Sequence, residues 1–267
     1  MQNAFTIDLE DWYQGIGLDA SQWDKYEKRI HVGHDKLLTL LSKKKVKATY
    51  FILGKLIEEH PDLIREIIAE GHEIACHTYS HQAIYAMEPE VFRKEIQLCK
   101  NLINALGSNY TGFRAPFFSI DNRSLWALDI LAAEGFVYDS SIYPGDNKRT
   151  GILGYPANIH KLENCLWEAP VSTFKILNFD PGLGGAYFRI LPYSFFRSKM
   201  REINKSRPGI FYIHPWELDP KHPYLTGLNK RIRYTHYFNL KSTEKKIEKL
   251  LEDFEFVPLI NIIGNSK

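Results

Sequence analysis

Two histidines stand four residues apart in the segment His77-Thr78-Tyr79-Ser80-His81. At this spacing they can share one face of a helical turn, with both imidazoles close enough to bind a single divalent metal. Residues 73–76 before them have the pattern of a buried strand, which Gly71 introduces. Because α/β folds usually keep their chemistry at the carboxyl ends of strands, this segment is a candidate metal site. The alternative is a pair of solvated surface histidines.

Four other polar segments also follow expected strands. Their side chains of interest are Asp8, Glu10 and Asp11 in the first segment, Arg114 in the second, Asp139 in the third and His214 in the fourth. Since the strand ends of a barrel converge on one face, these groups are expected to meet the histidine pair. A catalytic zinc site takes three protein ligands and keeps one position open, so a carboxylate is expected beside the histidines.

The five segments, in this order, resemble the motifs of the NodB-homology polysaccharide deacetylases, carbohydrate esterase family 4. At residues 8–12, 184–189 and 234–240 the chain is most similar to the exosortase-associated exopolysaccharide deacetylases. The resemblance covers nearly the whole chain. It implies one deacetylase domain over residues 1–267, with a family-specific C-terminal extension from about residue 215. It also implies a metal-dependent hydrolase that removes N-acetyl groups from hexosamine units of a polysaccharide or its lipid-linked precursor.

The same resemblance assigns acid–base roles. Asp8 matches the general base. Arg114 matches the arginine that pairs with this carboxylate and keeps it oriented and ionised, which a bidentate contact would do. His214 matches the histidine that protonates the leaving amine. Asp139 is expected to hydrogen-bond His214 and raise its pKa, although Ser141 stands where the family usually has tryptophan.

The metal ligands implied by the resemblance are His77, His81 and a carboxylate, with zinc the favoured ion. The family usually has a second aspartate directly after the base, but Leu9 stands there. Glu10 is favoured as the ligand because some family members space the acidic pair by two, and Asp11 is the second choice. The alternative is that both carboxylates merely solvate a loop.

Substrate contacts are expected from a backbone amide and from aromatic rings. The resemblance implies that the Phe117 N–H helps to hold the oxyanion, together with the metal. Trp12 and Trp216 each flank a motif and are candidates to stack on sugar rings. In a chain with 13% aromatic residues, packing in the core is the alternative for either ring.

The order of elements predicts a parallel sheet. Strands are expected at residues 4–8, 47–53, 73–76, 111–114, 136–138, 166–171, 209–214 and 255–258. Helices are expected at residues 33–43, 61–70, 89–106, 122–134, 193–204 and 243–253, while residues 144–164 and 215–239 have no regular pattern. Repeated strand–helix units of this length suit a closed barrel. The resemblance narrows this α/β class to a single-domain, distorted (β/α) barrel, commonly with seven strands.

Composition excludes several classes of partner. A net charge of +2 gives no electrostatic basis for binding nucleic acid. No apolar run of about 18 residues is present, so no transmembrane segment is expected. The N-terminus enters a strand at once, which leaves no room for a signal peptide and makes the cytoplasm the expected location.

Two rival functions stay open. The first is a deformylase or cyclic-imide hydrolase of the same fold. The second is a carbohydrate-binding protein that has lost catalysis, which the joint presence of Asp8, His77, His81, Arg114 and His214 argues against.

Overall fold

The computed structural model describes residues 1–146, 149–177 and 179–265. Within these ranges the main sheet has nine strands. Seven of them follow one another in parallel in the order β10 (Ile210–Ile213), β1 (Asn3–Leu9), β2 (Thr49–Ile52), β3 (Glu73–Cys76), β4 (Gly112–Phe113), β5 (Tyr138–Asp139) and β9 (Trp167–Glu168). The sheet curls, so that Arg114 after β4 reaches Thr6 and Asp8 on β1. The expected single-domain α/β fold with a distorted barrel is confirmed.

Shorter strands complete the sheet edges. β8 (His160–Lys161) pairs antiparallel with β9, and β11 (Phe256–Val257) pairs with the start of β1. β6 (Tyr143–Pro144) and β7 (Gly151–Ile152) form a separate parallel pair. Between β9 and β10, the described residues form only isolated bridges, and the one that reaches β10 joins Gly184 to Tyr212. The barrel is therefore incomplete on this side.

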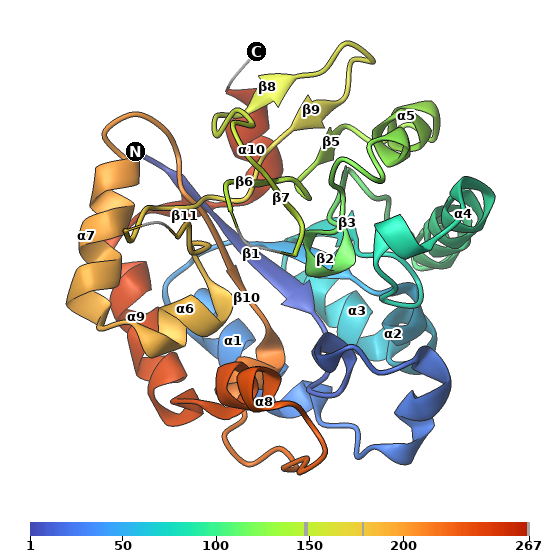
Figure 1. Cartoon of the computed structure of the whole chain (residues 1–267). Helices are drawn as coiled ribbons and strands as arrows, with labels where there is room; N and C mark the ends of the chain where they lie inside the picture. Colours follow the sequence, from blue (N-terminus) through green and yellow to red (C-terminus); the bar gives the residue numbers. More distant parts are fainter. Residues whose placement is uncertain (147–148, 178, 266–267) are drawn as a thin grey trace.

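Helices surround the sheet (Figure 1). They are α1 (Ile30–Lys43), α2 (Gly54–Glu59), α3 (Pro61–Ala69), α4 (Pro89–Ala105), α5 (Trp126–Ala133), α6 (Gly185–Ile190), α7 (Tyr193–Ile203), α8 (Lys230–Tyr237), α9 (Thr243–Asp253) and α10 (Leu259–Gly264). α2, α6, α8 and α10 were not expected from the sequence. No helix in the described ranges is long and apolar enough to cross a bilayer.

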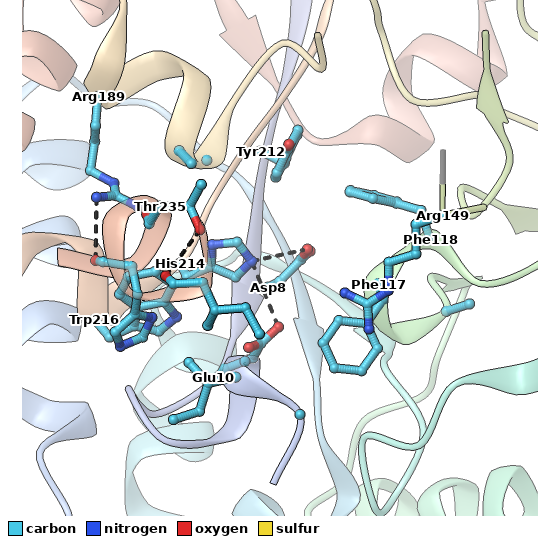
Figure 2. Close-up of a pocket in the computed structure, with 18 residues that line it drawn as sticks. Asp8, Glu10, Phe117, Phe118, Arg149, Arg189, Tyr212, His214, Trp216 and Thr235 are labelled. Carbon is cyan, nitrogen blue, oxygen red and sulfur yellow. Dashed lines mark hydrogen bonds and ion pairs between the residues drawn. The ribbon is translucent and has the colours of Figure 1, made fainter. Parts of the chain in front are cut away.

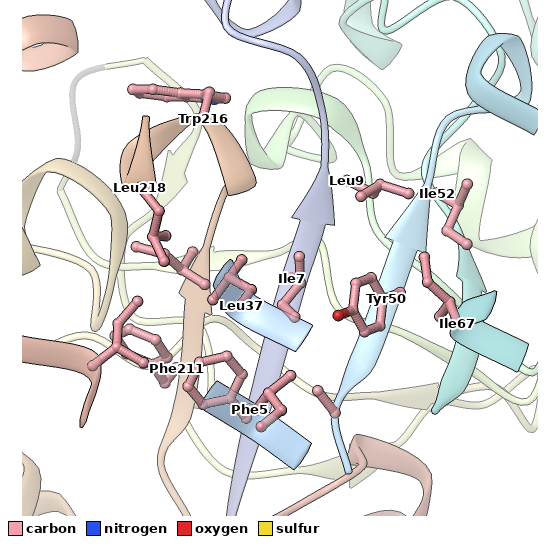
Figure 3. Packing of buried hydrophobic residues seen from close by; sticks show 14 of the residues in the cluster. Phe5, Ile7, Leu9, Leu37, Tyr50, Ile52, Ile67, Phe211, Trp216 and Leu218 are labelled. Carbon is pink, nitrogen blue, oxygen red and sulfur yellow. The ribbon is translucent and has the colours of Figure 1, made fainter. Parts of the chain in front are cut away.

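β1 shows how the sequence separates core from site. Successive side chains of a strand point to opposite faces. Phe5, Ile7 and Leu9 belong to a buried cluster that includes Leu37 of α1 (Figure 3). Asp8 lies on the opposite face and points into the barrel, where Arg114 meets it. Leu9 therefore packs in the core. The next residue after Asp8 that faces the barrel interior is Glu10.

A glycine on α1 sets the position of the segment after β10. This segment is the 3₁₀ turn η5 (Pro215–Leu218), which directly follows His214. A Cβ atom on Gly33 would lie 1.8 Å from the Pro215 carbonyl oxygen. Because that distance is far inside van der Waals contact, only glycine lets α1 pack this closely beneath the turn that follows His214.

Candidate active site

The register of the strands brings the motif residues to one level. Leu9 pairs with Ile52, and Ile52 pairs with Cys76, so Glu10 and His77 both follow immediately after aligned strand ends. On the other edge of β1, Ile7 pairs with Ile213, which places His214 beside Asp8. Four functional side chains therefore emerge at one end of the barrel because the strands are parallel and in register.

The histidine pair does not lie on a helical turn, and that expectation is wrong. Residues 77–81 form a loop in which Thr78 (φ 65°) and His81 (φ 56°) adopt the left-handed conformation. The His81 N–H donates to Thr78 Oγ1 at 3.2 Å, which holds the loop closed. Left-handed residues other than glycine cost of order 1 kcal/mol or more and gather at functional sites.

Glu10, His77 and His81 form a buried group of three potential metal ligands. Glu10 Oε1 lies 3.4 Å from His77 Nε2 and 3.1 Å from His81 Nε2. Ligands held about 2.1 Å from a tetrahedral zinc lie roughly 3.4 Å apart, so this spacing suits a divalent ion. His77 Nδ1 donates to the Arg114 carbonyl at 2.7 Å, which leaves Nε2 as a lone-pair donor. Buried Glu10 Oε2 has no hydrogen-bond partner among the described residues, as expected of an atom reserved for a ligand.

Asp11 has a different task. Its carboxylate accepts hydrogen bonds from the N–H groups of Trp12 (2.8 Å), Arg29 (2.7 Å) and Ile30 (3.0 Å). These contacts tie it to the start of α1, where free backbone donors need an acceptor. Burial raises the pKa of Asp11 to about 6, although the three hydrogen bonds oppose this shift. The geometry thus favours Glu10 over Asp11 as the metal ligand.

We expect Glu10→Gln to weaken metal affinity by about 10-fold or more, because even residues that only support ligands act on this scale. Asp11→Asn should leave metal affinity closer to wild type and lower thermal stability, since it weakens the cap of α1. Isothermal titration with Zn²⁺ and thermal melting of both variants would measure the two effects. The reverse order of affinities would give the ligand role to Asp11.

Asp8 is held by a buried arginine. Arg114 Nη1 donates to Asp8 Oδ1 at 2.7 Å and to Thr6 Oγ1 at 2.8 Å. The contact with Asp8 is single and not bidentate, because the Ser140 carbonyl and hydroxyl accept the other guanidinium N–H groups. Asp8 Oδ2 stays directed toward the pocket, 3.8 Å from His214 Nε2. A carboxylate fixed in this way can accept a proton from a water in the pocket.

His214 is oriented by its own turn. Its Nδ1 lies 2.7 Å from Glu217 Oε1, which also accepts the His214 backbone N–H at 3.1 Å. Nδ1–H therefore donates to Glu217, and Nε2 faces Asp8 and Glu10. Burial lowers the pKa of His214, but the charge of Glu10 and the hydrogen bond to Glu217 outweigh it and raise the pKa to about 9. Nε2 is thus placed to deliver a proton into the pocket.

Asp139 does not make the expected hydrogen bond to His214. It accepts hydrogen bonds from the Ser141 hydroxyl (2.5 Å) and N–H (3.1 Å), and Ser141 Oγ accepts from the Ala115 N–H at 2.7 Å. The reason is local, because Ser141 and the neighbouring Glu168 occupy the Asp139 carboxylate. Asp139 supports the turn after Arg114, and Glu217 takes the place that the sequence suggested for it. A histidine and an acid three residues apart around Pro215 resemble a capping box, the signal that would have indicated Glu217.

Asp139 also forms a buried carboxyl pair with Glu168. Burial, with the neighbouring Asp139, raises the pKa of Glu168 well above its usual value. The native chain therefore holds a proton that the unfolded chain loses near pH 4.5. Because the native state binds more protons, stability should fall as pH rises from there toward the raised pKa.

We expect Glu168→Gln to make this fall less steep, because the amide stays neutral at every pH. Thermal melts between about pH 4.5 and 8 would measure the slope. The matched control is Glu163→Gln at an exposed position, which should keep the wild-type slope. An unchanged slope in Glu168→Gln would show that the pair does not hold the extra proton.

The site opens into a cavity of about 500 Å³ (Figure 2). Its lining includes Asp8, Glu10, Phe117, Arg149, Arg189, Tyr212, His214, Trp216, Thr235 and His236. Phe117 has φ 58°, and its ring packs edge-on against His81 with centroids 4.6 Å apart. Trp216 stacks on His214 at 5.4 Å and lies across the cavity from Phe117. Tyr212, two residues before His214, was not among the expected site residues.

Trp12 does not face this cavity, so its expected role as a sugar platform is wrong. Its side chain is 1% exposed, and its Nε1–H donates to the Glu27 carbonyl at 2.9 Å. The ring stacks on His222 with centroids 5.6 Å apart. Trp12 therefore packs the segment after β1 against the segment after β10.

A second group of potential ligands overlaps the first. Atoms of Asp8, Glu10 and His214 also lie within 4.8 Å of one another. The Arg114 guanidinium already bonds Asp8, and its positive charge beside a cation would oppose binding there. The trio of Glu10, His77 and His81 is the better metal site.

Two family models match separate parts of the chain. The polysaccharide deacetylase model matches residues 23–135, and a domain of unknown function (DUF3473) matches residues 140–263. The chain is 34% identical over 119 residues to a peptidoglycan deacetylase of Helicobacter pylori, and 34% identical over 96 residues to a peptidoglycan-N-acetylglucosamine deacetylase of Bacillus cereus. These matches cover 43% and 35% of this chain, and 39% and 35% of the two relatives. The chain thus spans little more than a third of the length of these relatives.

Solved structures share the fold over nearly the whole chain. A polysaccharide deacetylase structure from Mycobacterium smegmatis matches 99% of this chain and 89% of its own, with a TM-score of 0.66 and 21% identity. A PuuE allantoinase structure matches 98% of this chain and 88% of its own, with a TM-score of 0.63 and 15% identity. At these identities the likeness shows the fold alone. Residues 23–135 are therefore similar to the polysaccharide deacetylases, and the two sequence relatives support this likeness.

Proposed function

We propose that this protein is a metal-dependent deacetylase that hydrolyses the N-acetyl group of a hexosamine unit in a polysaccharide or its lipid-linked precursor, in exopolysaccharide biosynthesis. One observation carries the proposal. Three buried potential metal ligands, Glu10, His77 and His81, lie together at one end of the barrel. Beside them are Asp8, which Arg114 holds, and His214, which Glu217 holds. Hydrolysis of an amide needs these three parts: an electrophilic centre, a base and an acid.

The two nitrogen donors and one carboxylate suit zinc, which we propose as the ion. When bound, a divalent metal polarises the amide carbonyl and lowers the pKa of water. Asp8 Oδ2 accepts a proton from the attacking water, while Arg114 Nη1 binds Asp8 Oδ1 and keeps this carboxylate oriented. His214 Nε2 then donates a proton to the nitrogen of the leaving amine, because its Nδ1–H is committed to Glu217. Acetate and a free amino sugar are the products.

The cavity also supports a sugar substrate. Trp216 presents an aromatic ring beside His214, and a pyranose can stack on such a face while its hydroxyl groups stay polar. A cavity of about 500 Å³ holds a sugar residue with its acetamido group. We propose the Phe117 backbone amide as a further donor to the oxyanion.

The test is hydrolysis of N-acetylglucosamine oligomers and peptidoglycan fragments by the zinc-loaded chain, with acetate measured enzymatically. An N-formyl amide and a cyclic imide serve as comparison substrates. We expect acetate release from at least one N-acetylated glycan and little turnover of the comparison substrates. Faster turnover of the formyl amide or the imide would assign the site to the corresponding hydrolase class.

A further inference from the structure

Arg189 of α6 is a buried arginine that uses all three of its guanidinium nitrogens. The side chain is 1% exposed. Its Nε donates to Glu217 Oε2 at 2.5 Å, and Nη2 donates to the Thr235 carbonyl at 2.5 Å. Nη1 donates to the carbonyls of Phe238 (2.6 Å) and His236 (3.3 Å). One side chain thus joins α6, η5 and the end of α8.

The contact with Glu217 leads to the catalytic histidine. Glu217 binds Arg189 through Oε2 and His214 Nδ1 through Oε1, and it is fully buried. Burial raises the pKa of Glu217, but the charges of Arg189 and His214 lower it below its usual value. Among the described residues, Arg189 and His214 are the only positively charged partners of Glu217. Without Arg189, the buried Glu217 carboxylate would lose a positively charged partner. His214 Nδ1–H would then lose an acceptor that is fixed in place.

The contacts with carbonyls lead to the wall of the cavity. The last carbonyls of a helix lack partners within the helix, and a cation there also complements the helix dipole. Arg189 supplies both a hydrogen-bond donor and a positive charge at the C-terminal end of α8. Ile232, Thr235 and His236 of this helix line the cavity. Figure 2 labels Thr235 among them. The position of α8 beside the cavity therefore depends on the Arg189 guanidinium.

Two glycines allow α6 to approach the site. A Cβ atom on Gly184 would lie 2.0 Å from the Tyr212 carbonyl oxygen, so α6 starts in direct backbone contact with β10. Gly185 has φ 51°, a conformation that glycine adopts at little cost. This close approach lets Arg189, one turn further, reach Glu217.

We propose that Arg189 is a positioning residue with two actions. Through Glu217 it fixes the orientation of the proton donor His214. Through the carbonyls of residues 235, 236 and 238 it holds α8 in place as a wall of the substrate cavity. The first action rests on the proposed function of His214. Arginine suits this place because its planar fork donates several hydrogen bonds in fixed directions, whereas a lysine ammonium is a single point charge.

The two actions separate in steady-state kinetics of the zinc-loaded chain. Glu217→Gln should lower kcat on an N-acetyl amide by about 10-fold or more, with a smaller loss on a nitrophenyl acetate ester and little change in KM. Arg189→Met should show the same loss of the amide-to-ester ratio and a raised KM for the glycan. Arg189→Lys should restore much of the ratio, because it keeps a charge near Glu217, but not KM, because it cannot hold three carbonyls.

Arg29→Met is the matched control. Arg29 Nε bonds Asp219 Oδ2 at 2.6 Å, directly after η5, but it does not line the cavity. Loss of this ion pair should leave the amide-to-ester ratio and KM within about 2-fold of wild type, the range expected for a partly exposed pair. A ratio or KM changed as much as in Arg189→Met would reduce the role of Arg189 to general stability.

A spectroscopic readout separates this inference from the proposed function. In protein with ¹⁵N-labelled histidine, the Nδ1 proton of His214, assigned with His214→Ala, should shift or broaden in Arg189→Met and stay unchanged in Arg29→Met. If wild type releases no acetate, the proposed function fails, and the proton resonance still decides the positioning of His214. An unchanged resonance with unchanged ratio and KM in Arg189→Met would overturn the proposal. If Arg189→Met does not fold, Arg189→Lys decides, and a wild-type KM in that variant would contradict the seating of α8.

Discussion

Asp8→Asn should lower turnover of an N-acetylated glycan by roughly 10²–10⁴-fold, the usual contribution of a positioned general base. The amide keeps the shape of the side chain and can still contact Arg114, but it cannot accept the proton of the attacking water. Metal content should stay at the wild-type level, because Glu10, His77 and His81 form the ligand trio without Asp8. Turnover and zinc per chain are measured on the same sample. Loss of zinc together with turnover would move Asp8 into the ligand set.

His214→Ala completes this test of the acid–base pair. It should slow amide substrates more than activated esters, since an amine leaving group needs a proton and a nitrophenolate does not. The amide-to-ester ratio of turnover is the measurement. If the variant slowed both substrates equally, His214 would bind or position the substrate, and another group would protonate the amine.

Replacing both histidines of the loop should abolish stoichiometric metal binding. His77→Ala and His81→Ala each remove one of three ligands, and the double variant leaves Glu10 alone. The chain should stay folded, because these side chains support the site and belong to none of the hydrophobic clusters of the described core. Equilibrium dialysis with Zn²⁺ and circular dichroism measure the two properties. One tightly bound zinc in a folded double variant would show that the metal site lies elsewhere.

The sequence predicted the fold and the meeting of the motifs because both depend on local pattern. Parallel strands with short connections bring strand ends to one face, so the order of elements alone places Asp8, His77, Arg114 and His214 together. The period of two in β1 separates Leu9, which packs in the core, from Asp8 and Glu10. This alternation is the physical reason why the acidic pair is spaced by two.

The predictions from sequence were wrong where tertiary contacts determine the conformation of a residue. The sequence does not reveal the left-handed conformations of Thr78 and His81, which replace the expected helical turn. Trp12 is adjacent to a motif, yet its ring turns into the core. Adjacency in sequence could not distinguish these outcomes.

The irregular pattern of residues 215–239 had a similar cause. α8 is rich in aromatic and β-branched residues, which have low helix propensity, so no helix was expected there. Its C-terminal carbonyls bond Arg189, a residue more than 40 positions earlier in the chain. Glu217, by contrast, carries a sequence signal in its capping-box spacing from His214, but that spacing was not used.

Metal-dependent removal of an acetyl group is the central claim, and a zinc titration of metal-free protein tests it most directly. Chelator-stripped chain is mixed with an N-acetylglucosamine oligomer, and acetate and free amine are measured at each zinc addition. We expect no products without zinc, then acetate and amine in equal amounts, with the rate reaching a plateau at one zinc per chain. Stoichiometric zinc binding without acetate release, or full release from the metal-free protein, would contradict the account.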